Sequence, residues 1–178
     1  GERPGPTPEL APQNWPVVTI RLPIFNEYHV VERLIAAATS VRAPKGKLEI
    51  QILDDSTDET ATLTRELVTK YQSRGHDIHW LRRGNREGFK AGALEAGLEV
   101  CRGELVAVFD ADFVPTADFL EKTVPWLVNG YGMVQARWSH INLEQSWLTQ
   151  VQGTLLDGHF VVEHAARCYG GRWFNFNG

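Results

Sequence analysis

Short apolar runs alternate four times with segments of helical periodicity, and the connections between them are short. The apolar runs are rich in Val, Ile and Leu and are bounded by polar residues, which predicts strands. The predicted strands are residues 17–22, 48–53, 78–81 and 105–109, and the predicted helices follow at 26–41, 56–71, 90–101 and 116–130. Such alternation is typical of an α/β fold with a mostly parallel sheet and helices on both faces. The last of these strands is the most apolar and is predicted to lie centrally.

Polar and special residues mark the predicted ends of the helices. Asn26 and Thr116 stand where a side chain caps a helix, and Ser56-Thr57-Asp58-Glu59 has the spacing of a capping box. Gly130 is predicted to end the fourth helix after a bend near Pro125.

Three further segments complete the predicted organisation. Residues 133–138 are predicted to form a fifth strand, and residues 143–169 a long helix that breaks at Gly153 or Gly158. Residues 1–16 hold five of the nine prolines, and such a run favours extended chain. The prediction is a proline-rich linker at 1–15 followed by one domain at 16–178.

Composition restricts the class of protein. A chain of 178 residues is long enough to bury a core and has the size of one domain. The formal net charge of −4 argues against a broad nucleic-acid surface. Two cysteines are too few for a disulfide framework and favour a reducing compartment. No apolar stretch reaches the roughly 18 residues of a membrane span.

Four carboxylates follow two of the predicted strands. Asp54 and Asp55 come after the second strand, and Asp110 and Asp112 come after the fourth. Parallel strands end at one edge of the sheet, where open α/β sheets bind ligands, so these residues are predicted to lie close together. Carboxylates gathered there repel one another unless a cation lies between them, and their oxygens suit Mg2+ or Mn2+. The competing interpretation is that each Asp only caps a helix or a turn.

A basic loop at residues 82–90 precedes the third predicted helix. Lys90 lies at the helix start beside small residues, and a helix amino end favours phosphate. The two arginines that open the loop are predicted to be solvated surface charges. At the end of the first strand, Phe25 and Glu27 are candidates to contact the face and the polar edge of a nucleobase.

Six short motifs follow one another along the chain. They are Phe25-Asn26-Glu27, Leu53-Asp54-Asp55-Ser56, residues 88–94, Phe109-Asp110-Ala111-Asp112, residues 134–138 and Phe176-Asn177-Gly178. By these motifs residues 16–178 resemble the family 2 glycosyltransferases, which have the GT-A fold. Within that family the chain is most similar to membrane-bound polysaccharide synthases of the cellulose synthase and glucomannan (mannan) synthase-like group.

The resemblance implies roles for individual residues. Those implied to bind the nucleotide sugar are Pro23, Phe25, Glu27, Asp54, Asp55, Lys90 and Asp110. Asp112, together with Asp110, is implied to hold Mg2+ or Mn2+ on the donor diphosphate. Those implied to approach the acceptor are Gln135, Trp138, Phe176, Asn177 and Gly178. The predicted long helix, with Asp157, His159 and Glu163, matches one that lies against the membrane, although an ordinary packing helix is the equal alternative.

The function implied is metal-dependent, inverting transfer of a hexose from UDP-glucose or GDP-mannose to a growing β-linked polysaccharide. The family's catalytic base lies downstream of Phe-Asn-Gly, and Gln135-Ala136-Arg137-Trp138 is one residue shorter than its Gln-x-x-Arg-Trp motif. We therefore expect these residues to be a piece of the GT-A domain, truncated on the C-terminal side, that lacks the acceptor half. Such a piece is expected to be soluble and to bind nucleotide without polymerising sugar. The full-length protein is expected to be multi-pass, with this domain on the cytoplasmic face of its membrane.

Three other functions compete with this one. The first is glucosyl transfer to a lipid acceptor, and the second is a regulatory nucleotide-binding domain without chemistry. The third is a phosphate-receiving signalling module, but its acidic pair would follow the first strand rather than the second. A dinucleotide-dependent dehydrogenase is disfavoured because no Gly-x-Gly-x-x-Gly follows the first predicted strand.

Overall fold

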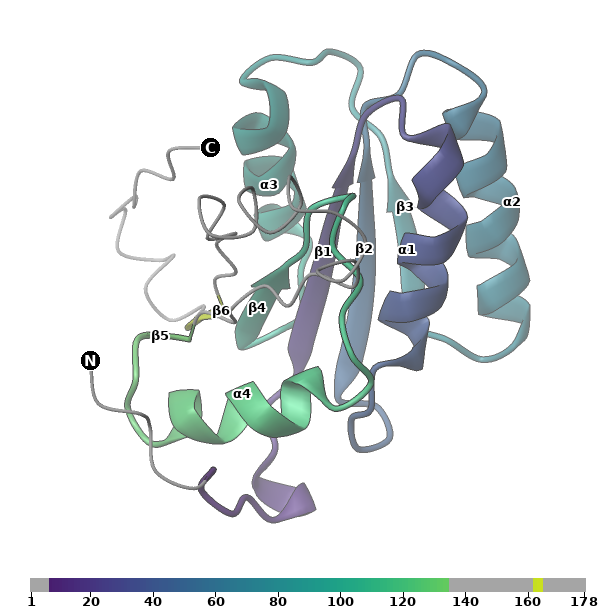
Figure 1. Ribbon diagram of the computed structural model, residues 1–178. Helices are drawn as coiled ribbons and strands as arrows, with labels where there is room; N and C mark the ends of the chain where they lie inside the picture. The colour runs from purple at the N-terminus through teal and green to yellow at the C-terminus, as the bar shows by residue number, and fades with distance from the viewer. Residues whose placement is uncertain (1–6, 135–161, 165–178) are drawn as a thin grey trace, which may run out of the picture.

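The computed structural model describes residues 7–134 and 162–164, which contain one twisted sheet with helices on both sides (Figure 1). The order of the strands across the sheet is β3-β2-β1-β4-β6-β5. The parallel strands are β1 (Val18–Ile24), β2 (Leu48–Asp54), β3 (Ile78–Leu81) and β4 (Leu105–Val108). The short strand β6 (Val162–His164) is antiparallel to both β4 and β5 (Met133–Val134). The predicted mostly parallel α/β fold is confirmed.

The direction in which the chain crosses the sheet determines which face each helix covers. Helices α1 (Tyr28–Ser40) and α2 (Thr60–Ser73) lie on one side, and α3 (Phe89–Glu99) lies on the other (Figure 1). The chain moves outward from β1 to β3 and then returns to the opposite side of β1 as β4. Because each crossover is right-handed, this reversal moves α3 to the other face. The crevice between β1 and β4 is the point where open α/β sheets bind ligands.

The two faces of the sheet differ in chemistry. On the face covered by α1, alternate strand residues such as Ile20, Leu22 and Ile52 are fully buried in an apolar core. Helix α4 (Phe119–Val128) closes this core, which includes four of its apolar side chains. The face under α3 is polar, because Thr19 donates to Glu49 at 2.6 Å and Arg21 Nη1 donates to the Leu94 carbonyl at 2.8 Å. The central strands are therefore packed on both faces of the sheet.

The predicted capping residues lie near the helix starts, but their side chains form hydrogen bonds between loops. Asn26 has a φ of 56°, and its carboxamide oxygen accepts from the Thr57 N–H at 2.9 Å. In return, the Asn26 N–H donates to the Ser56 hydroxyl oxygen at 3.0 Å. The cap predictions for both residues are therefore wrong, because each side chain joins the loop after β1 to the loop after β2. Asp58 instead accepts from the Thr60 N–H at 3.0 Å.

The fourth helix also begins later than the sequence predicted. Phe119 is its first residue, and Asp118 takes the position that precedes it. The Thr116 hydroxyl donates to the Asp118 carboxylate at 2.7 Å instead of accepting from the helix backbone, so its predicted cap is also wrong. Pro125 is inside the helix, and Gly130 follows its end with a φ of 97°.

One long predicted helix is contradicted where the structure describes it. Residues 162–164, inside the predicted helix at 143–169, form the strand β6, so Glu163 is not helical there. Strand β6 fills the open edge of β4, with Ala107 opposite Val162 and Leu105 opposite His164. Pairing along an unsatisfied strand edge overrides a local helical pattern. Asp157 and His159 lie outside the described residues.

Two other predictions concern the ends of the domain. The predicted strand at 133–138 is confirmed at Met133–Val134, and its remainder lies outside the described residues. Before β1, Pro12–Asn14 form a short 3-10 turn and Trp15 is buried in the core. The division into a linker at 1–15 and a domain at 16–178 stays a prediction.

Within the described residues, none of the helices has the length and apolar character needed to cross a membrane.

Candidate functional site

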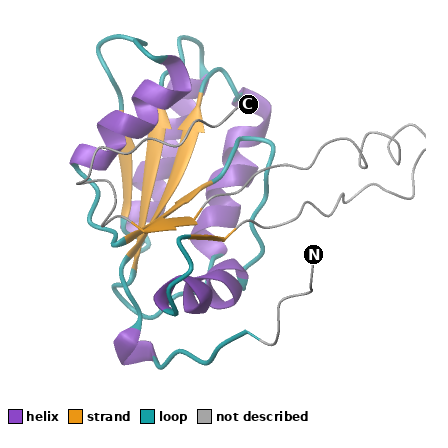
Figure 2. Ribbon diagram, turned by 90° about the vertical axis from the view of Figure 1, so that its left-hand side faces the viewer, coloured by secondary structure: helices purple, strands orange, loops and turns teal. Residues whose placement is uncertain are grey.

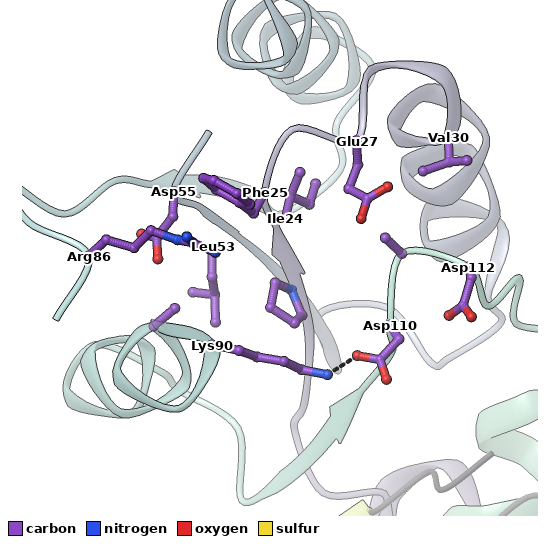
Figure 3. A pocket seen from close by; sticks show the side chains of 13 residues that line it. Ile24, Phe25, Glu27, Val30, Leu53, Asp55, Arg86, Lys90, Asp110 and Asp112 are labelled. Carbon is purple, nitrogen blue, oxygen red and sulfur yellow. Dashed lines mark hydrogen bonds and ion pairs between the residues drawn. The ribbon is translucent and has the colours of Figure 1, made fainter. Parts of the chain in front are cut away.

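An open cleft of about 460 Å³ lies at the carboxyl ends of β1, β2 and β4 (Figure 3). Residues from four separate parts of the chain line it, including the loops after β1 and β4 and the start of α3. Seven of the predicted site residues are among them: Pro23, Phe25, Glu27, Asp55, Lys90, Asp110 and Asp112. The parallel sheet therefore brings together residues that are up to 89 positions apart in the sequence, from Pro23 to Asp112.

Asp54 is the predicted nucleotide-binding residue within the described chain that does not line the cleft. Asp54 is 1% exposed, and its carboxylate accepts two hydrogen bonds. The Ser56 N–H donates to one carboxylate oxygen at 2.8 Å, and the Trp80 indole N–H donates to the other at 2.9 Å. Asp54 thus fastens the loop after β2 to β3, which is a structural role.

Asp110 and Asp112 share the short loop that follows β4 and both border the cleft (Figure 3). Asp110 forms an ion pair with Lys90, whereas the Asp112 carboxylate is exposed and has no partner within residues 7–134. Among the described residues, no group of three or more His, Cys, Asp or Glu side chains could hold a metal ion. Any metal here would therefore need oxygens from a ligand in addition to these two carboxylates.

The ion pair between Lys90 and Asp110 crosses the cleft from α3 to the loop after β4. The two side chains are 52% and 46% exposed. Ion pairs with such access to water contribute only about 0–1 kcal/mol, so an incoming phosphate can replace the carboxylate at little cost. Lys90 is thus placed to exchange one anion for another.

Arg83 is largely shielded from solvent, contrary to the prediction of a solvated surface charge. Its side chain is 16% exposed and that of Asp55 is 8% exposed. The guanidinium donates to both Asp55 oxygens, through Nε at 3.1 Å and through Nη2. The hydrogen bond to Asp55 raises the pKa of Arg83 above its ordinary value, so the guanidinium stays charged. Arg82 is exposed as predicted, although its Nη2 donates to the Ser56 carbonyl at 2.6 Å.

Arg86 is a cleft residue that the sequence analysis did not single out. Its guanidinium carbon lies 3.3 Å from the centroid of the Phe25 ring and 5.1 Å from that of Phe89. A cation over an aromatic face is attracted by the negative charge of the ring. No sequence pattern could have indicated this contact, because Phe25 and Arg86 follow different strands and meet only in the folded chain. The predicted acceptor residues Gln135, Trp138, Phe176, Asn177 and Gly178 lie outside the described residues.

Comparison with known families gives the class of the protein. Residues 19–173 match the profile of glycosyl transferase family 2. The match extends over most of the chain and includes every cleft residue described above. The chain therefore belongs to glycosyl transferase family 2.

Several curated relatives are plant proteins named as glucomannan 4-beta-mannosyltransferases. The chain is 42% identical to Glucomannan 4-beta-mannosyltransferase 2 of Arabidopsis thaliana over 176 residues, which is 96% of the chain and 33% of the relative. It is 40% identical to Glucomannan 4-beta-mannosyltransferase 1 of Oryza sativa subsp. japonica over 181 residues, 98% of the chain and 35% of the relative. The resemblance to glucomannan synthase-like enzymes is thus confirmed. The chain spans about a third of the length of these relatives.

Solved structures confirm the GT-A fold. The mannosyltransferase PcManGT of Pyrobaculum calidifontis, in complex with GDP-Man and Mn2+, matches with a TM-score of 0.69 and 22% identity. That match covers 90% of this chain and 48% of PcManGT. TarS 1-349 of S. aureus in complex with UDP-GlcNAc matches with a TM-score of 0.61 and 18% identity, over 86% of this chain and 47% of TarS.

Proposed function

We propose that this chain is the donor-binding part of a glycosyltransferase that transfers mannose from GDP-mannose to a growing β-linked polysaccharide. The observation that supports this proposal is the cleft at the carboxyl ends of the strands. It brings together Phe25, Lys90 and the loop that holds Asp110 and Asp112. The sequence leaves UDP-glucose and GDP-mannose open as donors. The identity of 40–42% to glucomannan 4-beta-mannosyltransferases favours mannose as the sugar, and the similar structure of PcManGT holds GDP-Man. An inverting course and a glycan rather than a lipid acceptor remain predictions.

The cleft offers separate regions for the parts of a nucleotide sugar. Phe25 and Arg86 supply flat faces on which a nucleobase can stack. Lys90 and the amino end of α3 supply positive charge for the diphosphate. Asp55, which also lines the cleft, is held in one orientation by Arg83. This order of base, diphosphate and sugar would direct the sugar toward Asp110 and Asp112.

Asp110 and Asp112 fit a divalent metal ion. Their carboxylates are hard oxygen ligands on one loop, and Asp112 has no competing partner in the described part of the chain. With the donor's diphosphate oxygens they would hold Mn2+ or Mg2+. When bound, such an ion offsets the negative charge that develops on the departing diphosphate.

Lys90 has a matching electrostatic role. Its ammonium group would leave Asp110 and bind the diphosphate, which stabilises the charge of the leaving group. The same movement frees an Asp110 oxygen for the metal or the sugar. The membrane association of the longer protein and the position of this domain on the cytoplasmic face remain proposals.

Calorimetric titration of the chain with GDP and with UDP, each with and without Mn2+, tests this function. We expect GDP to bind more tightly than UDP and Mn2+ to strengthen the binding. Asp112→Ala should weaken the Mn2+-dependent binding about tenfold or more. The matched control is Glu66→Ala, which removes an exposed carboxylate on α2 and should change nothing. A chain that binds neither nucleotide contradicts the proposal, and tighter binding of UDP contradicts the choice of donor.

A further inference from the structure

We infer that Arg83 is a positioning residue for donor binding, because it fixes the start of α3 from which Lys90 reaches the diphosphate. This inference rests on the proposed function. Arg83 itself is not among the residues that line the cleft. Its effect on the donor therefore passes through the residues that it bonds, which are Asp55 in the cleft and the loop at residues 84–89 that leads to Lys90. The inference concerns the second of these routes, through Lys90.

One guanidinium joins three parts of the chain. Arg83 follows β3, and it donates to the Asp55 carboxylate after β2 through Nε at 3.1 Å and through Nη2. Its Nη1 also donates to the Glu87 carbonyl at 2.7 Å, and Nη2 donates to the Phe89 carbonyl at 3.0 Å. The planar fork of arginine allows these bonds at the same time, which the single ammonium group of lysine cannot reproduce.

The backbone held by these bonds is unusual. Gly88 has a φ of 68°, and Phe89, the residue before Lys90, has a φ of 47°. A bulky side chain seldom adopts this left-handed conformation, and it persists only where surrounding contacts enforce it. Phe89 is 66% exposed, so packing of its side chain contributes little to this conformation. The bond from Arg83 to the Phe89 carbonyl therefore stabilises the turn that starts α3.

A glycine in the first turn of α3 permits this arrangement. A Cβ atom at Gly92 would lie 2.2 Å from the Glu87 carbonyl oxygen and 2.6 Å from Arg83 Nη1. Both distances are shorter than real contacts of a Cβ atom. The loop, the guanidinium and the helix can thus approach one another only because residue 92 has no side chain.

The two ion pairs of the site differ in their exposure to water and therefore in how readily they exchange partners. Lys90 and Asp110 are about half exposed, whereas Arg83 and Asp55 are 16% and 8% exposed. A shielded pair with two parallel hydrogen bonds persists, and an exposed pair exchanges readily. The structure thus combines a fixed frame, Arg83 with Asp55, and an exchangeable cation, Lys90.

The test compares two ligands that differ only in the β-phosphate, GDP and GMP, in the presence of Mn2+. Arg83→Lys should weaken GDP binding roughly ten- to hundredfold, which is the loss expected from one charge-assisted contact, and change GMP binding little. Lys90→Ala should have a similar effect. The double variant should bind GDP no more weakly than Lys90→Ala, because Arg83 acts through Lys90. Arg82→Lys, at a neighbouring arginine that also bonds a carbonyl, is the control and should bind as the wild type does.

Each outcome decides between the roles. Equal losses of GDP and GMP affinity in Arg83→Lys, or additive losses in the double variant, indicate general structural damage and overturn the inference. Gly92→Ala, which disturbs the same frame from the helix side, should also reduce GDP affinity selectively. Wild-type affinity in Arg83→Lys overturns the inference alone. A wild-type chain that binds neither GDP nor UDP overturns the proposed function and this inference with it.

Discussion

Asp54 and Asp55 are neighbours in the sequence but have opposite surroundings. Successive side chains at the end of a strand point to opposite sides, so one turns into the protein and the other turns toward the cleft. Asp54 is satisfied by the Ser56 N–H and the Trp80 indole. Asp55 faces Arg83 and the ligand side. A pair of acidic residues after a strand therefore need not be a pair of ligand-binding residues.

Asp54→Asn should reduce stability rather than binding. The carboxamide oxygen of the variant can accept from only one of the two donors, the Ser56 N–H and the Trp80 indole N–H, and the other would face the NH2 group. A buried donor without an acceptor costs about 1–3 kcal/mol of folding free energy. Urea unfolding should show this loss, while GDP titration at a temperature where the variant is folded should give wild-type affinity. Glu66→Gln, at an exposed carboxylate on α2, is the control. A stable Asp54→Asn chain with weak GDP binding would restore the nucleotide-binding role implied by the resemblance.

Phe25 should contribute to nucleotide affinity by stacking. Its ring already has the Arg86 guanidinium on one face. Phe25→Leu should weaken GDP binding about tenfold, because base stacking on an aromatic ring is worth roughly 1–3 kcal/mol. Titration with pyrophosphate, which has no base, should give equal affinities for wild type and variant. Tyr131→Leu removes an exposed ring away from the cleft and serves as the control. Unchanged GDP affinity in Phe25→Leu would exclude stacking on this ring.

At the scale of elements, α4 is tied to the end of α1 by polar contacts at its amino end. The Arg42 N–H donates to the Ala117 carbonyl at 2.7 Å, and its guanidinium donates to both Glu121 oxygens, at 3.0 and 2.6 Å. The Lys122 ammonium and the Thr116 hydroxyl lower the pKa of Asp118 to about 2. A carboxylate near a helix amino end also interacts favourably with the helix dipole.

The stability that Asp118 supplies should depend on pH in a definite direction. Its pKa is lower in the folded chain than the ordinary value of 3.8, so its contribution is present above that value and is lost as the pH falls through about 2. The unfolding midpoints of wild type and Asp118→Asn should differ by a small, constant amount above pH 5 and converge toward pH 2. In a Lys122→Met background the difference should shrink. A difference that grows on acidification would contradict this assignment.

At the scale of elements, the sequence predicted much of the fold but less of the connections. All four parallel strands and their helices occur within a few residues of their predicted positions, because periodicity is a local property. The strand β6 was missed, since it exists by pairing with β4, a partner more than 50 residues away. Asn26 and Ser56 were assigned as caps, since their bonds join two loops that only the sheet makes adjacent.

At the scale of the whole molecule, the carboxyl and amino ends of the parallel strands form two surfaces that differ in chemistry. The carboxyl ends of the strands carry the charged cleft, and the amino ends carry a second cavity of about 350 Å³. Trp15, Lys47 and Glu104 are among the residues that line the second cavity. Figure 2 shows how the central strands run side by side, so that each set of ends forms a separate surface.

Nucleotide binding should protect backbone amides from hydrogen exchange at the carboxyl ends of the strands and not at the amino ends. With GDP and Mn2+, amide hydrogen exchange should slow at residues 24–27, 55–57, 86–93 and 110–113 and stay unchanged around Trp15, Lys47 and Glu104. A ligand at a hundred times its Kd stabilises the folded state by about 2.7 kcal/mol, so the unfolding temperature should rise as well. Protection confined to the opposite cavity would show that the donor site has been assigned to the wrong edge.

The order of apolar and polar residues alone determined the four parallel strands, the helices between them and the edge at which Phe25, Lys90, Asp110 and Asp112 meet. It could do so because periodicity acts over a few residues and parallel strands necessarily end together. Only the tertiary structure decided that Asp54 turns inward, that Arg83 pairs with Asp55 and that Arg86 lies on Phe25. Those outcomes depend on which loops become neighbours, and contacts between distant segments leave no periodic trace in the sequence.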